Sequence, residues 1–360
     1  MKNTDSLINN LKCLLPWHPA RIEIMAILMT GMIQIRSVNL KNIARTMPGS
    51  TLIDSRYKRL KRFFSDFNFS QETIARLIAS WLLPSDHWVL CIDRTNWKFG
   101  KKDINILMVS VVHHHGMSIP ILWQLLPKRG NSNTDERIQL ITKFIRIFGS
   151  NRIDHLVADR EFIGECWFKW LKDNNISFRI RLRSNFLAKH PNRTDSLKVY
   201  RYFSLQKNES MVLNQSRKLW GIPVYLSCYR SETERVIIAS DQYTTSALND
   251  YSQRWQIETL FQAFKGRGFD LEATRMVDSD RLDKLICVLI MSYCWAYKVG
   301  LWRHEQKPIK VLKHNRKARS IFSYGMEWLS DQLFSQNIMT DEFISLLPID
   351  NQNVLRTGYD

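Results

Sequence analysis

The segment from Tyr251 to Lys265, YSQRWQIETLFQAFK, contains a carboxylate and two cations at the spacing that places residues on one side of a helix. At about 100° per residue, Tyr251, Arg254 and Lys265 fall within about 40° of Glu258. Apolar residues occupy the neighbouring face, which gives such a helix a core to pack against. An exposed ladder of ion pairs has the same pattern. This segment alone is therefore compatible with both a structural role and a phosphate-handling site.

Two aspartates far upstream favour the chemical interpretation. Asp93 ends the apolar run in HWVLCIDRTNW, and Asp159 ends the run in IDHLVADREF, so each is expected at the end of a buried strand. Strand ends form the edge of an α/β sheet where ligands collect, although turns also favour Asp. Glu161 is an alternative to Asp159, but Asp159 directly terminates its run. Asp93, Asp159 and Glu258 together predict a metal site.

A resemblance to a known family rests on these residues. The spacing of four of them resembles the YREK signature of bacterial insertion-sequence transposases, in the family conventionally numbered four: Tyr251, Arg254, Glu258 and Lys265. Asp93 and Asp159 match that family's first two acidic positions, and ADREFIG is similar to its second motif. The likeness runs from about residue 88 to 275. It implies a DDE transposase with a ribonuclease H-like core, acting by cut-and-paste on the terminal inverted repeats of its own element.

The predicted order of elements leads to the same fold. After the Asp93 strand come two strand-like runs that meet near Gly116, a helix over 133–149, the Asp159 strand, a helix within 162–175 and a strand over 177–184. Three strands followed by helix, strand, helix and strand is the ribonuclease H-like order. Residues 184–240 hold short alternating runs, which predict a β-rich insertion before the Glu258 helix. The fold class is thus α/β, with an N-terminal helical domain.

We expect five regions along the chain. They are a helical DNA-binding domain (1–84), the first part of the ribonuclease H-like core (85–183), the β-rich insertion (184–240), the second part of the core with the Glu258 helix (241–300) and a basic C-terminal region (301–360). The N-terminal helices have a basic face that suits recognition of DNA ends, but no specific DNA-binding motif is present.

The charge balance makes nucleic acid the first partner to expect. The chain has 52 Lys and Arg against 34 Asp and Glu, a net charge of +18. One helical stretch, RYKRLKR, concentrates five of these cations: Arg56, Lys58, Arg59, Lys61 and Arg62. Such a run is often only a solvated helix face, but the excess along the whole chain favours phosphate contact. Trp255 would flank the DNA or seal the edge of the core, and Trp220 would stack on a base displaced from the duplex or simply pack in a strand.

A mechanism follows from the carboxylates. Asp93, Asp159 and Glu258 would hold two Mg²⁺ or Mn²⁺ ions about 3.5 to 4 Å apart. One ion would activate the attacking water or 3′-hydroxyl, and the other would stabilise the leaving 3′ oxygen. Tyr251, Arg254 and Lys265 would bind phosphates near the scissile bond. The family resemblance further implies a hairpin intermediate, strand transfer into target DNA and a homodimer in the synaptic complex.

Two other functions share many of these features. A ribonuclease H-like nuclease or resolvase would use the same metals without joining ends, and a non-catalytic repressor of transposition would bind DNA without cutting it. The longest apolar runs, near 24–33 and 285–297, are shorter than the roughly 20 residues that span a bilayer, so no membrane partner is expected. Six cysteines without a CxxC pair, and an N-terminus without a secretory pattern, predict a cytoplasmic, nucleoid-associated protein.

Overall fold

The computed structural model describes residues 2–84, 86–192, 195–313 and 315–335. The chain folds into two compact units. The helical unit contains residues 1–83, 97–104 and 260–360, and the sheet unit contains residues 84–96 and 105–259. Each unit is built from segments that are distant in the sequence.

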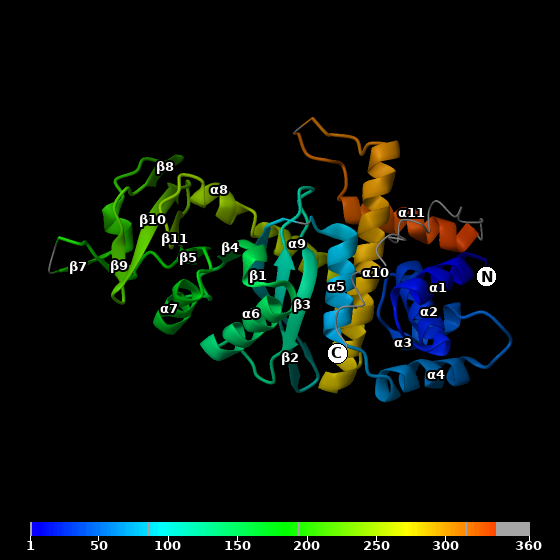
Figure 1. Ribbon diagram of the computed structural model, residues 1–360. Coiled ribbons are helices and arrows are strands. Elements are labelled where there is room, and N and C mark those ends of the chain that lie inside the picture. Colours follow the sequence, from blue (N-terminus) through cyan, green and yellow to red (C-terminus); the bar gives the residue numbers. More distant parts are fainter. Residues whose placement is uncertain (1, 85, 193–194, 314, 336–360) are drawn as a thin grey trace. The chain divides into compact units, whose positions relative to one another are not determined.

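The core of the sheet unit has the predicted order of elements (Figure 1). The chain forms β1 (Trp88–Phe99), β2 (Lys102–Val111), β3 (Ile119–Leu125), α6 (Thr134–Phe148), β4 (Ile153–Ala158), α7 (Glu165–Asp173) and β5 (Phe178–Leu182). A capping box begins α6, in which the Asn133 side chain accepts from Glu136 N and the Glu136 carboxylate accepts from Asn133 N. Gly149, with φ of +88°, ends it. The prediction of an α/β, ribonuclease H-like core is confirmed.

The sheet runs in the order β3-β2-β1-β4-β5-β11-β10-β9-β6-β7, with β8 paired to β10. Strand β4 pairs in parallel with both β1 and β5. Parallel strands are covered on both faces, which explains the continuous apolar run of β1, where Leu90, Cys91 and Ile92 are fully buried. The paired segments of β1 and β4 end side by side, with Ile92 opposite Ala158.

The insertion is β-rich, as expected. Its strands are β6 (Leu187–Lys189), β7 (Ser196–Lys198), β8 (Glu209–Val212), β9 (Arg217–Leu219), β10 (Ile222–Arg230) and β11 (Arg235–Ser240). Strand β11 pairs antiparallel with β5, from Ile237 opposite Leu182 to Ser240 opposite Arg179. The insertion therefore extends the core sheet through a continuous hydrogen-bonded ladder.

The N-terminal part of the helical unit is helical, as expected for residues 1–84. Its helices are α1 (Lys2–Leu14), α2 (Pro19–Ile35), α3 (Leu40–Thr46), α4 (Ile53–Asp66) and α5 (Gln71–Leu82), and α11 (Ile321–Ser335) lies near the end of the described residues. The long helix α10 (Ser279–Gln306) packs against α2, α5 and α11. Gly325 and Gly300 permit the close crossing of α10 and α11, because a Cβ on Gly325 would lie 1.9 Å from Ala296 O.

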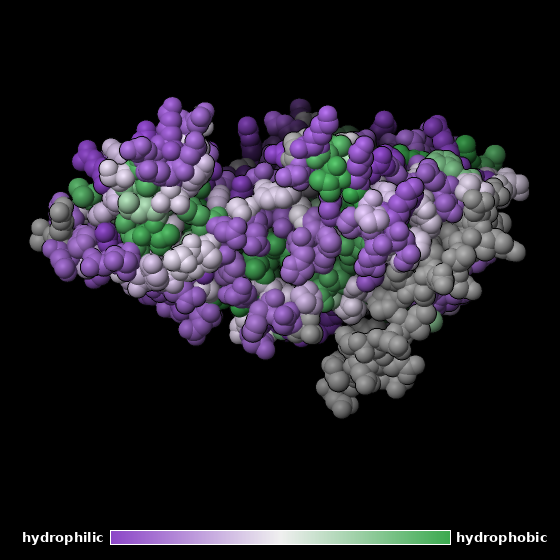
Figure 2. All heavy atoms as spheres, turned by 90° about the horizontal axis from the view of Figure 1, so that it is seen from above, coloured by the Kyte–Doolittle hydropathy of each residue, from purple (hydrophilic) through white to green (hydrophobic). Residues whose placement is uncertain are grey.

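Helix α10 is longer than the apolar run within it suggests. It is 28 residues long and, by length and composition, could cross a membrane, yet 83% of its most apolar stretch is buried inside the protein. Core helices of globular proteins have this character. On the face of the molecule shown in Figure 2, hydrophilic residues cover most of the surface and hydrophobic ones form separate small patches.

Candidate active site

The two strand aspartates lie side by side. In the parallel pairing of β1 with β4, Ile92 lies opposite Ala158, so Asp93 and Asp159 follow the last paired position on neighbouring strands. The expectation that both residues end a strand is correct for Asp159. It is wrong for Asp93, because β1 continues to Phe99 and turns into the hairpin with β2. The strand extends because residues beyond Asp93 pair with β2 after the pairing with β4 stops.

The Asp93 carboxylate lies in an environment that disfavours its charge. The pKa of Asp93 is raised to about 7, mainly by burial and also by the nearby Glu161 and Asp159 carboxylates, although Arg94 N and the Arg254 guanidinium act in the opposite direction. Asp93 Oδ1 accepts a hydrogen bond of 2.7 Å from Arg94 N. A carboxyl held in this way gains from any additional positive charge that binds beside it.

The signature segment is not the single helix that its periodicity predicts. Helix α8 ends at Ser252 and α9 begins at Trp255 (α8, Ala247–Ser252; α9, Trp255–Phe264). Between them, Arg254 N and Ile257 N bond to the carbonyl three residues earlier, Tyr251 O and Arg254 O, instead of four residues earlier. This tight turn brings Arg254, which lies in the turn itself, next to Tyr251 in the last turn of α8.

Arg254 connects the three carboxylates. Its Nη1 donates to Asp93 Oδ2 at 3.3 Å, its Nη2 donates to Glu258 Oε1 at 2.7 Å, and its Nε donates to the Tyr251 hydroxyl at 3.1 Å. The Tyr251 hydroxyl in turn donates to Asp159 Oδ1 at 3.3 Å. A surface ladder of ion pairs would explain the bond from Arg254 to Glu258, but it would not explain the bond to Asp93 on a central strand.

The protonation states of Arg254 and Tyr251 suit both residues to donate these hydrogen bonds. Burial opposes the charge of Arg254, but Tyr251 and the carboxylates of Glu258 and Asp159 outweigh it and raise the pKa of the guanidinium. Burial raises the pKa of Tyr251 to about 12, so its hydroxyl stays protonated and can donate. The Glu258 side chain is 52% exposed, whereas Arg254 is 13% exposed. Glu258 is thus the carboxylate of the set that is most open to a ligand.

Contacts from β1 and the β2–β3 connection fix the start of α9. Gln256 Oε1 accepts from His113 N at 3.0 Å, and the Cys91 thiol donates to Arg254 O at 3.7 Å. The Trp255 ring lies against Gly116, where a Cβ would be 3.3 Å from Trp255 Cη2 and where φ is +77°. Trp255 is nevertheless 51% exposed. The Trp255 ring therefore packs against the turn at Gly116 and leaves part of its aromatic surface exposed.

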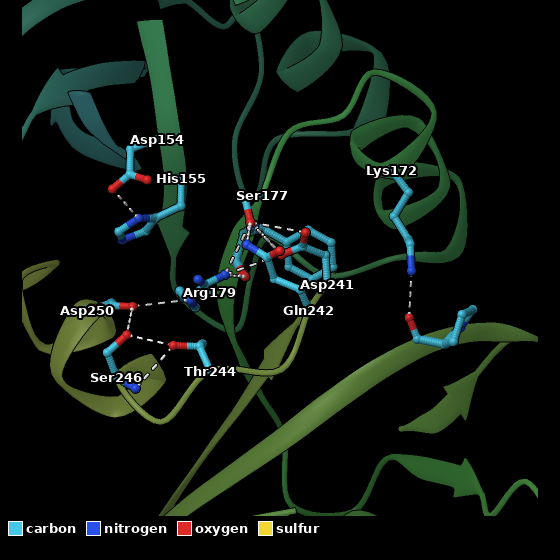
Figure 3. Close-up of polar contacts among 12 residues, drawn as sticks. Asp154, His155, Lys172, Ser177, Arg179, Asp241, Gln242, Thr244, Ser246 and Asp250 are labelled. Atoms are coloured by element: carbon cyan, nitrogen blue, oxygen red, sulfur yellow. Dashed lines mark hydrogen bonds and ion pairs between the residues drawn. The ribbon is translucent and has the colours of Figure 1, made fainter. Parts of the chain in front are cut away.

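A buried ionic network holds α8 against the sheet (Figure 3). Arg179 on β5 donates from Nη1 to Asp241 Oδ1 at 3.2 Å and from Nε to Asp250 Oδ2 at 3.3 Å. Asp241 follows β11 and also accepts from Ser177 Oγ and Phe178 N. Because Asp250 precedes Tyr251 in α8, this network positions the hydroxyl that bonds Asp159.

Glu161 has its own partner. Arg94 Nε and Nη2 each bond one Glu161 oxygen at 3.2 Å, a bidentate pair. Glu161 lies beyond β4, which ends at Ala158, so strand alternation does not place it on the same face as Asp159. Glu161 faces a guanidinium while Asp159 faces the Tyr251 hydroxyl, which favours Asp159 as the ligand.

The three carboxylates are chemically suited to bind a hard divalent cation. Asp93, Asp159 and Glu258 offer carboxylate oxygens, the ligands that Mg²⁺ and Mn²⁺ prefer. Among the residues that the structure describes, no three His, Cys, Asp or Glu side chains are grouped closely enough to hold a metal ion. Arg254 bonds two of the three carboxylates instead. Metal binding therefore requires the guanidinium to yield these oxygens.

Sequence reasoning missed an arginine-rich pocket. A hollow of about 490 Å³ is lined by residues that include Arg160, Arg181, Arg183 and Arg235, with Glu234 and Tyr200. Arg181 Nη2 bonds Glu234 at 2.6 Å. The signal was present as Arg181 and Arg183 at alternate positions near the end of RIRLRS, a spacing that a strand directs to one face, and as Arg160 directly after Asp159.

Trp220 sits in a strained turn. It joins β9 to β10, with φ of +50°, followed by Gly221 with φ of +85°. Positive φ at both positions is typical of a tight hairpin turn, in which Asn or Asp normally precedes Gly. The indole contacts Phe168 and Phe186 edge-on, is 38% exposed, and lines a hollow of about 740 Å³. Trp220 thus packs against two rings and remains partly exposed, and it lies in the turn between β9 and β10 instead of within a strand.

The N-terminal cations separate into two groups. Arg56 donates to Met47 O and Gly49 O, and Arg59 pairs with Glu23 at 3.1 Å. Lys58, Lys61 and Arg62 are exposed on α4, and Lys61 lies 5.7 Å from the centre of the Tyr57 ring.

Lys265, the last signature residue, follows the end of α9. Its Nζ pairs with Glu272 at 2.8 Å, a partner that the sequence pattern does not indicate.

Comparison with known proteins identifies the family. No curated protein matches the chain. The family model described as transposase DDE domain matches residues 84–295, which is more than half of the chain. The matched range contains both strand aspartates, the whole β-rich insertion and the Tyr251 to Lys265 segment. The chain therefore belongs to the transposase DDE domain family.

Proposed function

We propose that the protein is a cut-and-paste transposase of insertion-sequence family four. It binds the terminal inverted repeats of its element, cleaves them through a hairpin intermediate and joins the 3′ ends to target DNA. One observation carries the proposal. Asp93, Asp159 and Glu258 come from two adjacent parallel strands and a distant helix, and one Arg254–Tyr251 pair connects all three. Membership in the family implies a metal-dependent enzyme that acts on DNA.

Asp93, Asp159 and Glu258 would hold two Mg²⁺ or Mn²⁺ ions. When bound, such ions lower the pKa of water and stabilise charge on phosphate oxygens. The protein's own contribution is to keep three like charges near one another before DNA arrives, and Arg254 does so by bonding two of them. A guanidinium is also a bidentate phosphate ligand. Arg254 can therefore exchange carboxylate oxygens for DNA phosphate oxygens, leaving the carboxylates to the metal.

Further DNA contacts follow from the exposed groups of the sheet unit. The arginine-rich pocket beside Asp159 supplies phosphate ligands through Arg160 and Arg183. Trp220 supplies a surface on which a displaced base stacks, since large residues are seldom held at positive φ without a functional reason. Trp255 flanks the DNA with its exposed edge. In the helical unit, the half-buried Lys265 keeps the phosphate role that the YREK resemblance implies.

In the N-terminal helices, Lys58, Lys61 and Arg62 contact DNA directly, while Arg56 and Arg59 orient α4 through their protein partners. Two ends must be cut together, so the working form is a homodimer in the synaptic complex. The protein acts in the cytoplasm, at the nucleoid, because its substrate is chromosomal DNA.

The test uses a labelled duplex that carries the terminal repeat of the element. Wild type, Glu258→Gln and the control Glu165→Gln are incubated with Mg²⁺ or with EDTA, and cleavage and joining are followed on a gel. Glu165 is a suitable control because it is an exposed glutamate in the first turn of α7. We expect metal-dependent cutting and joining by wild type and Glu165→Gln, and intact binding without cutting by Glu258→Gln.

Each other result supports a different function. Equal cleavage by wild type and Glu258→Gln would reject the ligand assignment. Metal-dependent cutting without joining or end preference would indicate a ribonuclease H-like nuclease. Binding by wild type without any cutting would indicate a repressor of transposition.

A further inference from the structure

The helical unit contains a hollow that the carboxylate site does not use. It measures about 360 Å³ and is bounded by α3, α4 and the segment from Thr274 to Arg281 that leads into α10. Four cations line it: Lys41, Lys61, Arg275 and Arg281. We call it the four-cation pocket.

Four cations share this lining with one carboxylate, so most of their charge is unbalanced. Each of the four side chains is exposed, and none forms an ion pair with any residue in the described part of the chain. The one carboxylate in the lining, Asp278, caps α10 by accepting from Arg281 N at 3.0 Å. Four like charges around one hollow repel one another unless an anion binds among them.

The placement of Arg281 is informative in itself. It lies in the first turn of α10, with Asp278 as the N-cap, where the partial positive charge of the helix end disfavours a cation. Arg281 is therefore not explained by the stability of its own helix.

The wall of the pocket is fixed in place. The Lys102 ammonium donates to Val277 O, Met276 N donates to Thr274 Oγ1 at 3.2 Å, and Val38 N bonds Phe269 O at 2.9 Å. The pocket is consequently preformed, which lowers the entropic cost of binding. Tyr57, with Lys61 near its ring, adds a flat aromatic surface to the wall.

We infer that the four-cation pocket binds the phosphodiester backbone of duplex DNA. The assignment rests on the proposed function, which supplies DNA as the polyanion, and it adds Lys41, Arg275 and Arg281 to the contacts of α4. The cations lie on α3, on α4 and at the start of α10, so they would contact the DNA backbone from three elements. A basic stretch on a single helix would contact it along that helix alone. This makes the pocket a backbone anchor, independent of base sequence.

The test measures binding of a fluorescent duplex at several salt concentrations. Each phosphate contact contributes about 0.9 to the slope of log K against log salt. We therefore expect Arg281→Ala and Lys61→Ala each to lower the magnitude of the slope by about 1. The charge-preserving Arg281→Lys should keep most of it. Lys12→Ala, which removes an exposed cation of α1, should leave the slope unchanged.

A second measurement locates the contact. Lys41 and Lys61 should be protected from acetylation when the duplex is bound, and Lys12 should not. The proposal that the pocket binds DNA would be overturned if all three lysines were acetylated equally with and without DNA. It would also be overturned if Arg281→Ala and Lys61→Ala kept the wild-type slope. If wild type then still cleaves its ends, the proposed function survives. A wild-type protein without any salt-dependent DNA binding would overturn both.

Discussion

Two arginines of the sheet unit, the buried Arg179 and the half-buried Arg254, each join two carboxylates, yet their surroundings differ. Arg179 is 6% exposed and pairs with Asp241 and Asp250, which are 20% and 14% exposed. Arg254 is 13% exposed and pairs with Asp93 and Glu258, of which Glu258 is half exposed. Arg179 lies in a closed network, whereas Arg254 faces a carboxylate that is open to ligands.

Hydrogen bonding shows what the difference means. Asp241 accepts from Ser177 and Phe178 as well as from Arg179, and Asp250 also accepts from Ser246 Oγ at 2.8 Å (Figure 3). Those charges are satisfied, which is the requirement for a buried ion pair that stabilises a fold. Asp93 instead has its pKa raised to about 7 by burial. An incompletely compensated carboxylate is typical of a functional site.

The largest effect is expected at Asp93, where a substitution should lower the cleavage activity without lowering the stability. Asp93→Asn should lower the rate of DNA cleavage by about 10²-fold to 10³-fold or more, the size seen when one group that stabilises transition-state charge is lost. The melting temperature at pH 7.5 should be unchanged or higher, because the amide removes a buried charge that the fold disfavours. Gel cleavage and thermal denaturation test this, and a clear loss of stability would contradict it.

Arg179 should behave in the opposite way. Arg179→Met leaves Asp241 and Asp250 without their cation, and breaking a buried pair from one side costs about 3–5 kcal/mol. Denaturant unfolding followed by near-ultraviolet circular dichroism should show the loss. Arg179→Lys, which keeps the charge, is the matched control and should lose less. Equal stability of wild type and Arg179→Met would show that the network is not structural.

The Tyr251 hydroxyl links the two arginine centres through α8. Tyr251→Phe removes the bond to Asp159 and the acceptor for Arg254 Nε, and a hydrogen bond of about 1.4 kcal/mol corresponds to a tenfold change. Cleavage should fall about 10-fold with little change in the affinity for DNA. An effect as large as that of Glu258→Gln would mean that the hydroxyl takes a direct part in the chemistry.

The smallest effect concerns pH and His155. Burial lowers the pKa of His155, and the Arg179 charge lowers it further, while Asp154 and Asp250 oppose the shift. The neutral ring therefore contributes stability above the unfolded pKa of about 6.5, and this is lost as the pH falls below that value. The gap in melting temperature between wild type and His155→Gln should narrow from pH 7.5 to pH 5. A gap in melting temperature that does not change with pH would contradict the lowered pKa of His155.

Local signals predicted most of the core correctly. The apolar runs predicted the strands β1 and β4, and the helix predicted over 133–149 matches α6, which Asn133 caps and Gly149 ends. Such features depend on periodicity and caps, which neighbouring residues determine.

Predictions from the sequence failed where contacts between distant segments determine the local structure. The turn between α8 and α9 breaks a sequence that is periodic throughout. It puts Tyr251 beside Asp159 and Arg254 beside Asp93, from residues separated by 92 and 161 positions. The Lys265 pair with Glu272 was likewise not indicated, since the sequence pattern gave Lys265 a place on the Glu258 face.

The sequence by itself determined which residue types this protein can use, the order of its core elements and the excess of positive charge. Only the tertiary structure decided which of those charges meet. It joined Arg254 to two carboxylates, closed the network around Arg179, and gathered Lys41, Lys61, Arg275 and Arg281 around one hollow that has a single carboxylate, Asp278, in its lining. The reason is physical. Helix and strand patterns follow from residues within one or two turns, whereas the energy of a charge depends on burial and on partners that arrive from elsewhere in the chain.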